Sequence, residues 1–241
     1  MEQREKIVGI IGGMGPEATV DFMRRLIAAT PAQDDRDHLH VLADNNSKIP
    51  SRIAALIEGT GEDPTPVLCR MAQGLEAQGA DFLVIPCNTA HHYLPAIARS
   101  VRIPLLDMVE LSVKKLLTAG TKPRRIGVLA TPAVRLVGLY SERMERAGLQ
   151  ALFPAPLDEA ALLAVIKAVK AGQFNEAHRK DYARIAKGLA DVGAEALLMA
   201  CTELSIIGPP DGVTAPVIDT LDVLVQATIA TARGESRSLE F

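Results

Sequence analysis

Two cysteines stand at the ends of what the sequence predicts to be buried strands, in two segments of similar pattern. Segments 79–89 and 193–203 each open on Gly-Ala, continue through an apolar run, and reach Cys87 or Cys201 eight positions after the glycine (87 − 79 and 201 − 193). Two half-chains related by pseudo-symmetry would bring these thiols face to face across a cleft. Such a pair can remove a proton from one side of a carbon atom and deliver one to the other side, so the pattern favours acid–base chemistry.

The composition predicts an α/β protein. Of the 241 residues, 48% are hydrophobic but only 3% are aromatic and none is tryptophan. The core must therefore consist of Ala, Val, Ile and Leu, as in parallel sheets covered by helices. The chain is long enough for one large domain or two small ones. Its net charge of −3, without a basic run, argues against a nucleic-acid partner.

Other classes of protein are disfavoured by features that the sequence lacks. No apolar stretch approaches the roughly 18–20 residues of a membrane span. Residues 1–6 lead at once into a strand-like run, without the cleavage site of a signal peptide. Three cysteines without CxxC spacing argue against a disulfide framework and against a cysteine-rich metal site. We therefore expect no membrane association, no metal, and a reducing, cytoplasmic setting.

Short apolar runs alternate with longer segments of helical periodicity, which predicts βαβ units and mostly parallel sheets. In the helix expected from residue 66, Leu68, Met71 and Leu75 form an apolar stripe before a glycine stop. The expected strands are 6–12, 38–44, 81–86, 103–106, 125–130, 149–153, 195–200 and 215–218. The expected helices are 17–29, 66–78, 92–100, 109–119, 133–147, 158–171, 176–192 and 222–232.

The repeat predicts two similar lobes, each a mostly parallel sheet flanked by helices, related by pseudo-two-fold symmetry. Residues 7–12 open the first half and residues 126–131 the second, and residues 118–123 form the clearest linker. The final strand and helix, from about Ala215, are expected to cross back to the first half, and the polar tail 234–241 is given no role. The predicted lobes are 1–108 with 219–241, and 109–218.

Polar side chains gather at the predicted carboxyl ends of the strands, where open α/β sheets bind their ligands. Asn88 and Thr89 follow the first cysteine, and Thr202 and Glu203 the second. Asn and Thr usually cap the helices that begin at such turns, but the backbone N–H groups there also attract a carboxylate. Helix N-termini and nearby cations stabilise a thiolate, so a cysteine in this position can have a lowered pKa.

Further candidate residues lie in a loop, in predicted helices and at the end of a predicted strand. Arg52, in a polar loop, can clamp a carboxylate with its planar fork, although an arginine that opens a helix is often solvated. Lys167 and Lys170 share one face of a predicted helix, and their spacing alone assigns them no role. Thr131 ends a predicted strand. Cys69 lies inside a helical stripe without a counterpart in the other half, so we expect it to be structural.

Two features allow other interpretations. Residues 13–18 match G-x-G-x-x-A after a strand, with Asp44 ending the next strand, and so resemble a dinucleotide fingerprint. That motif leaves the cysteine repeat unexplained, and the chain has no Walker loop. His91 and His92 lie close to Cys87, but no further metal ligands accompany them, so no metal site is expected.

The chain resembles the cofactor-independent aspartate/glutamate racemase family over nearly its whole length. The Cys-Asn-Thr-Ala-His block at 87–91 and the Cys-Thr-Glu block at 201–203 do most to identify it. Gly-Gly-Met-Gly-Pro-Glu-Ala-Thr at 12–19 and Ile-Pro-Ser-Arg at 49–52 match as well. The resemblance implies two α/β lobes with the substrate between them, a homodimer, and neither pyridoxal phosphate nor metal.

The resemblance also implies roles for single residues. Two cysteines would be the acid–base groups, and Arg52 and Lys170 would hold substrate carboxylates with Asn88, Thr89 and Thr131. Many relatives carry a second threonine shortly after the position of Thr131, where this chain reads Pro-Ala-Val. The predicted catalytic residues are Cys87 and Cys201. The predicted substrate-binding residues are Met14, Arg52, Asn88, Thr89, Thr131, Lys170, Thr202 and Glu203.

The sequence thus predicts a racemase that interconverts L- and D-aspartate, with glutamate as the second choice, by two-cysteine proton transfer at the α-carbon. Aspartate is preferred because the matching blocks are those of the aspartate branch. A racemase of hydantoins or an isomerase of maleate would also fit the superfamily. Outside it, a nicotinamide-dependent oxidoreductase using the turn at 13–18 and a non-catalytic small-acid binding protein stay open.

Overall fold

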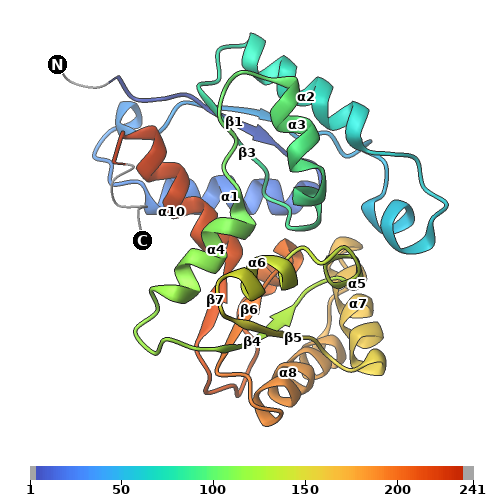
Figure 1. The fold of residues 1–241 in the computed structure, drawn as a ribbon. Helices are drawn as coiled ribbons and strands as arrows, with labels where there is room; N and C mark the ends of the chain where they lie inside the picture. Colours follow the sequence, from blue (N-terminus) through green and yellow to red (C-terminus); the bar gives the residue numbers. More distant parts are fainter. Residues whose placement is uncertain (1–3, 236–241) are drawn as a thin grey trace.

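The computed structural model describes residues 4–235 and contains two β-sheets in two lobes, each flanked by helices (Figure 1). The first sheet has the order β2-β1-β3 and the second the order β5-β4-β6-β7, with parallel pairing throughout the described strands. The predicted two-lobed α/β class is confirmed. None of the helices within this range is long and apolar enough to cross a bilayer. Two parts of the sequence predictions lie outside the described residues. They are residues 1–3 of the segment considered for a signal peptide and residues 236–241 of the polar tail.

Along the strands of the first sheet, successive side chains point alternately to the two layers of helix that cover it. Ile10 and Val84 face a core shared with α1 and α10, whereas Ile11 and Leu83 face α2. This alternation is the period of two that a sheet covered on both faces requires. The strands are β1 (Val8–Ile11), β2 (Val41–Asp44) and β3 (Phe82–Val84). The helices are α1 (Pro16–Ala29), α2 (Thr65–Ala77) and α3 (Leu94–Ser100), with short 3-10 helices at Asp35–Asp37 and Thr89–Tyr93 and a π-helical turn at Ala54–Glu58.

The second sheet is covered in the same way. Val128 and Leu198 pack against α4 and α6 on one face, whereas Leu129 and Leu197 pack against α7 and α8 on the other. The strands are β4 (Arg125–Leu129), β5 (Gln150–Leu152), β6 (Ala196–Met199) and β7 (Val217–Asp219). The helices of this half are α4 (Met108–Leu117), α5 (Pro132–Leu136), α6 (Ser141–Arg146), α7 (Pro156–Lys170), α8 (Glu176–Asp191) and α9 (Thr202–Ile207). The last helix, α10 (Thr220–Ala232), follows β7 and packs on the first sheet.

Equivalent glycines in the central strands show the repeat in atomic detail. A Cβ atom added to Gly9 would lie 2.6 Å from Cδ2 of Leu83, and one added to Gly127 would lie 2.6 Å from Cδ2 of Leu197. Both strands therefore need glycine for the same reason, because a leucine of the neighbouring strand fills the space. The two lobes use one packing solution twice.

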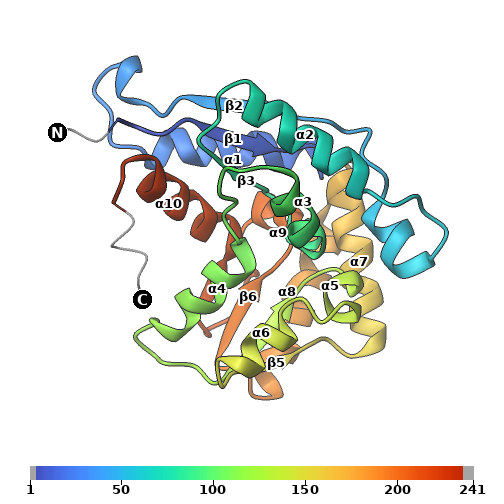
Figure 2. The ribbon, with the colours of Figure 1, turned by 45° about the horizontal axis from the view of Figure 1, so that its top comes forward.

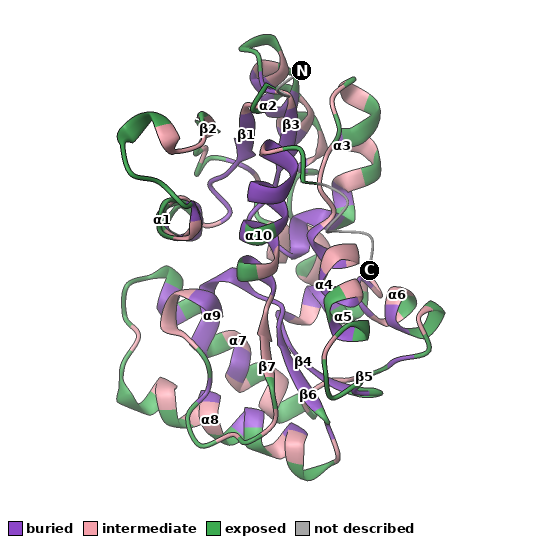
Figure 3. Cartoon of the chain, turned by 90° about the vertical axis from the view of Figure 1, so that its left-hand side faces the viewer, coloured by how far each residue is buried: buried purple, intermediate pink, exposed green. Residues whose placement is uncertain are grey.

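The lobes meet where α10 crosses from the second sheet to the first. Figures 1 and 2 show α10 beside α4, and Figure 3 shows that α10 is largely buried. The strand before it was expected to accompany this helix to the first half, but β7 instead pairs with β6 and extends the second sheet. The crossing therefore begins at the strand's end. The exact residues that divide the lobes stay a prediction.

Some expected elements are shorter or divided. The strand expected at 103–106 is only a single bridge between Leu83 and Leu105. The helix expected at 133–147 is two helices, α5 and α6, because Gly138 takes a positive φ of 64° between them. The helix expected at 92–100 begins as the 3-10 turn Thr89–Tyr93.

Candidate active site

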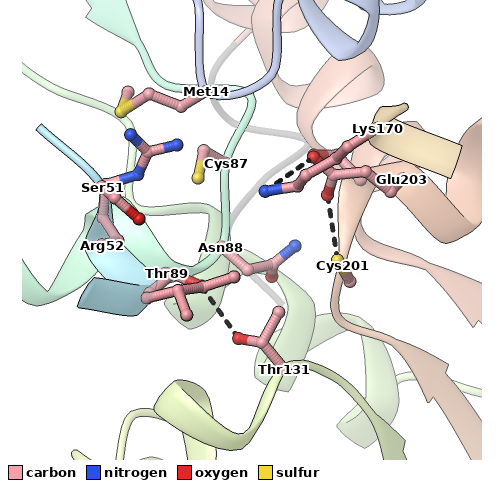
Figure 4. A pocket seen from close by; sticks show the side chains of 12 residues that line it. Met14, Ser51, Arg52, Cys87, Asn88, Thr89, Thr131, Lys170, Cys201 and Glu203 are labelled. Atoms are coloured by element: carbon pink, nitrogen blue, oxygen red, sulfur yellow. Dashed lines mark hydrogen bonds and ion pairs between the residues drawn. The ribbon is translucent and has the colours of Figure 1, made fainter. Parts of the chain in front are cut away.

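A pocket lies where the carboxyl ends of the two sheets meet, and every predicted site residue lines it (Figure 4). Its volume is about 40 Å³. A cavity must offer roughly 10–15 Å³ to hold one water molecule, so this pocket has room for a few waters and not for a whole amino acid. The lining must therefore move to admit one. The lining residues are Met14, Ser51, Arg52, Ile53, Cys87, Asn88, Thr89, Thr131, Lys170, Cys201, Thr202 and Glu203.

The backbone of Cys87 is held by a buried histidine. His91 Nδ1 lies 2.9 Å from the Cys87 carbonyl oxygen, and the Met108 N–H donates to His91 Nε2 over 3.0 Å. Because that N–H can only donate, Nε2 must accept, and Nδ1 carries the proton that is donated to Cys87. Burial lowers the pKa of His91, which keeps the ring neutral as this arrangement requires.

His91 therefore has no ring nitrogen left for a metal ion. Across residues 4–235, no cluster of three or more His, Cys, Asp or Glu side chains is arranged to hold one. His91 is better explained as a support for the turn that carries Cys87.

Cys201 immediately precedes α9, and its thiol faces Glu203. The Cys201 Sγ donates to Glu203 Oε2 over 3.0 Å. The other carboxylate oxygen, Oε1, lies 3.3 Å from Nζ of Lys170, the last residue of α7. Figure 4 shows this row of thiol, carboxylate and ammonium along one side of the pocket. Lys170 and Glu203 thus contact each other, not only the cavity.

The pKa of both thiols is raised, so the lowered pKa that helix ends and nearby cations can produce is not found here. Burial is the largest cause at each cysteine. At Cys201 the negative charge of Glu203 raises the pKa further and Lys170 opposes it, whereas at Cys87 the positive charge of Arg52 opposes the effect of burial. Helix ends and cations are present, but desolvation outweighs them.

Lys170 keeps its charge in this setting. Burial alone would lower the pKa of its ammonium, but the negative charge of Glu203 and the nearby thiols outweigh that effect, and the pKa is raised. The second lobe therefore presents a cation to the pocket, as Arg52 does from the first.

Threonine hydroxyl groups form a further part of the lining. Thr89 Oγ1 lies 3.2 Å from Thr131 Oγ1, which joins the turn after β3 to the turn after β4. The Thr202 hydroxyl is buried and has no hydrogen-bond partner within the described chain. An unpaired buried hydroxyl costs about 1–3 kcal/mol, so a ligand that bonds to Thr202 would remove a penalty.

Arg52 reaches the pocket from the first residue of the short helical segment that follows the loop after β2. Its Nη1 donates to the Pro50 carbonyl oxygen over 3.1 Å, and Figure 4 shows the guanidinium near Met14 and Cys87. Ser51 and Ile53, on either side of Arg52, also line the pocket and were not predicted. The polar loop was a sufficient signal for Ser51, whereas nothing in the pattern indicates Ile53.

The glycine turn at 13–18 has a structural explanation of its own. Gly13 has a φ of 90°, and a Cβ atom on it would lie 2.1 Å from the backbone oxygen of Asn46. Its N–H donates to Thr19 Oγ1 over 3.0 Å. Gly13 is therefore required by the chain's own loop, which accounts for the first glycine of the motif without a dinucleotide.

Comparison with known proteins assigns this chain to a family. The description Asp/Glu/Hydantoin racemase belongs to a family profile that matches residues 11–228. The chain is a member of this family. The predicted family and the predicted enzyme class, an amino-acid racemase among the isomerases, are confirmed.

Individual relatives of this racemase span different shares of the chain. The aspartate racemase of Picrophilus torridus has a solved structure with a TM-score of 0.85 and 31% identity, covering 98% of this chain and 100% of that one. The broad specificity amino-acid racemase RacX of Bacillus subtilis (strain 168) is 26% identical over 231 residues, which are 93% of this chain and 97% of that protein. The glutamate racemase of Aquifex aeolicus (strain VF5) is 30% identical over 142 residues, which are 56% of this chain and 51% of that protein.

In this racemase, Glu203→Gln is expected to lower the pKa of Cys201. The substitution removes the negative charge that raises this pKa and leaves the Lys170 ammonium, which lowers it. Thiolate should then form at a lower pH than in the parent protein. Ultraviolet thiolate absorbance followed across pH, in a Cys69→Ser, Cys87→Ser background, measures the titration of Cys201 alone.

The exposed carboxylate of Glu62 provides the matched control for that titration. Glu62→Gln removes the same charge from an exposed residue outside the pocket lining and should leave the curve where it is. A curve for Glu203→Gln that overlays the parent would show that Glu203 does not set the pKa of Cys201.

Proposed function

We propose that this racemase interconverts the L- and D-enantiomers of an acidic amino acid, aspartate first, by proton transfer between Cys87 and Cys201 without a cofactor. The observation that carries the proposal is the placement of both thiols in one buried pocket, one after β3 of the first sheet and one after β6 of the second. A base and an acid on opposite faces of one carbon are what inversion of its configuration requires.

In the proposed reaction one cysteine acts as thiolate and the other as thiol. The thiolate sulfur forms an S–H bond with the α-proton, and the electron pair of the broken C–H bond delocalises into the carboxylate. The second thiol then gives its proton to the opposite face, so its S–H bond breaks as the new C–H bond forms. Nothing is oxidised or reduced, and the cysteines exchange roles for the reverse substrate.

The charges around the pocket favour one starting arrangement. At Cys87 the positive charge of Arg52 opposes the rise in pKa that burial causes, whereas at Cys201 Glu203 adds to that rise and holds the thiol proton in a hydrogen bond. Cys87 is therefore the better candidate for the thiolate and Cys201 for the thiol. Glu203, assigned to the substrate by sequence, is proposed to act mainly on Cys201 and Lys170, because its own charge repels a carboxylate.

The carbanionic intermediate needs donors around its carboxylate. Preorganised donors of this kind are typically worth about 3–4 kcal/mol each. We assign this role to residues that line the pocket and have donor capacity to offer. They are Arg52, Asn88, Thr89, Thr131, Lys170 and Thr202.

Aspartate is proposed as substrate because the Picrophilus torridus aspartate racemase matches nearly all of the chain. The other relatives, a glutamate racemase and a racemase of broad specificity, make glutamate and further amino acids the alternatives. Met14 and Ile53 form the apolar part of the lining and would limit side-chain length. A homodimer and a cytoplasmic setting stay predictions, and light scattering during gel filtration tests the first.

The decisive experiment is a panel of L- and D-amino acids incubated with the protein in deuterated buffer. Aspartate is expected to exchange its α-proton and to racemise fastest, as followed by mass spectrometry and chiral chromatography. Binding of aspartate without any exchange would instead establish a small-acid binding protein. Saturable binding of a nicotinamide dinucleotide, with no exchange, would favour an oxidoreductase.

A further inference from the structure

A buried chain of hydrogen bonds holds the side-chain amide of Asn88. The Tyr140 hydroxyl donates to Asn88 Oδ1 over 2.6 Å, and Asn88 Nδ2 donates to Thr220 Oγ1 over 3.0 Å. Thr220 Oγ1 in turn donates to the Met199 carbonyl oxygen over 2.9 Å. Tyr140 and Thr220 are fully buried and do not line the pocket, whereas Asn88 does.

The direction of each hydrogen bond follows from the far end of this chain. The Met199 carbonyl can only accept, so the single proton of the Thr220 hydroxyl goes to it. The Thr220 oxygen must then accept, which places the nitrogen of the Asn88 amide toward Thr220. The amide oxygen consequently faces Tyr140, whose phenol must donate. Burial raises the pKa of Tyr140, so the phenol keeps the proton that it donates.

The chain leaves one donor of Asn88 unused. A side-chain amide has two N–H groups, and one of them bonds to Thr220. Within residues 4–235 the Asn88 nitrogen makes no second hydrogen bond. Asn88 lines the pocket, and Figure 4 shows its amide between Cys87 and Cys201. The remaining N–H is thus available to an acceptor in the pocket.

We propose that Tyr140 and Thr220 are positioning residues, which fix the Asn88 amide so that it presents N–H, and not oxygen, to the substrate carboxylate. The proposal rests on the proposed racemase function. Without the phenol the amide can turn over, and its oxygen would then face the carboxylate and repel it. Tyr140 immediately precedes α6 and Thr220 is the first residue of α10, so the turn after β3 is oriented by groups distant in sequence.

Tyr140→Phe tests this directly, because it removes one oxygen and keeps the buried ring. The kcat/KM for α-proton exchange is expected to fall roughly 10- to 100-fold, since a misplaced group at the reacting centre has effects up to that size. Tyr182→Phe is the matched control. Its hydroxyl is also buried but has no hydrogen-bond partner within the described chain, and its removal should leave kcat/KM unchanged.

The pair Thr220→Val and Thr220→Ser tests the other end of the chain. Valine removes the hydroxyl at similar size and should lower kcat/KM in the same range, whereas serine retains the hydroxyl and should restore most of it. If the melting curve shows that Tyr140→Phe does not fold, the two Thr220 variants still test the proposal.

A double-mutant cycle separates positioning from a merely structural effect. If Tyr140 acts through Asn88, then Tyr140→Phe should cost little more in a protein that already carries Asn88→Ala. Provided that the parent protein is active, either of two results would overturn the positioning role. One is full additivity of the two losses, and the other is an unchanged kcat/KM in both Tyr140→Phe and Thr220→Val. A parent protein that exchanges no acidic amino acid would overturn the proposed function itself, and the positioning role would fall with it.

Discussion

Replacing either Cys87 or Cys201 with alanine is expected to lower kcat for aspartate racemisation by about 10²–10⁴-fold, the usual contribution of a positioned general acid or base. Each thiol serves one face of the α-carbon, so the loss of either blocks both directions. The loss should fall mainly on kcat, because the carboxylates of the substrate are proposed to be bound by other side chains. Both cysteines are small and lie at the edge of the core, so the variants should fold.

Rates for L- and D-aspartate, measured separately in deuterated buffer, give the sharpest test. In the parent protein, early product should carry deuterium while the remaining substrate keeps protium, because the two faces use different sulfurs. Cys69→Ala is the control. The Cys69 sulfur lies on α2 near the Ala96 carbonyl oxygen, 3.7 Å away, and does not line the pocket. Near-parent rates in both Cys87→Ala and Cys201→Ala would end the two-base proposal.

Arg25→Ala is expected to lower the free energy of unfolding by about 3 kcal/mol, toward the low end for a broken buried ion pair. Arg25 extends from α1 to Asp219, at 2.7 Å, and to the carbonyl oxygen of Ser205 on α9, at 2.5 Å. It therefore joins the first lobe to two elements at the edge of the second. Without it, Asp219 loses its cation at a site where burial already raises its pKa.

Arg24→Ala provides a matched comparison from the same helix. Arg24 forms an ion pair with Asp21, as Arg25 does, but its side chain is 68% exposed against 17% for Arg25. An exposed pair is worth about 0.2–1 kcal/mol, so Arg24→Ala should be nearly silent. Urea unfolding measures both. Equal losses would show that the contacts of Arg25 across the lobes add nothing.

The sequence predicts the lobes well because each lobe is built from local patterns. The repeated Gly-Ala, apolar run and cysteine mark β3 and β6, and the leucine stripe marks α2. Element ends are less legible. The single bridge at Leu105 and the break at Gly138 depend on what packs beside them, and apolar periodicity does not record that.

For the site, the sequence predicts which residues come together but not how they contact one another. All ten chosen residues line one pocket, because parallel strands deliver their last residues to the same edge. Their mutual contacts were not predictable. The ion pair of Lys170 with Glu203 joins residues that no motif connects, and the raised pKa values follow from burial in three dimensions. Tyr140 and Thr220 could not be identified from the sequence, because their proposed role depends on a hydrogen-bonded chain through Asn88.

The size of the cavity has a kinetic consequence. A space of about 40 Å³ does not hold a whole amino acid, so the lining must rearrange when a ligand binds. When such a rearrangement limits association, the observed rate levels off at high ligand concentration and does not rise without limit.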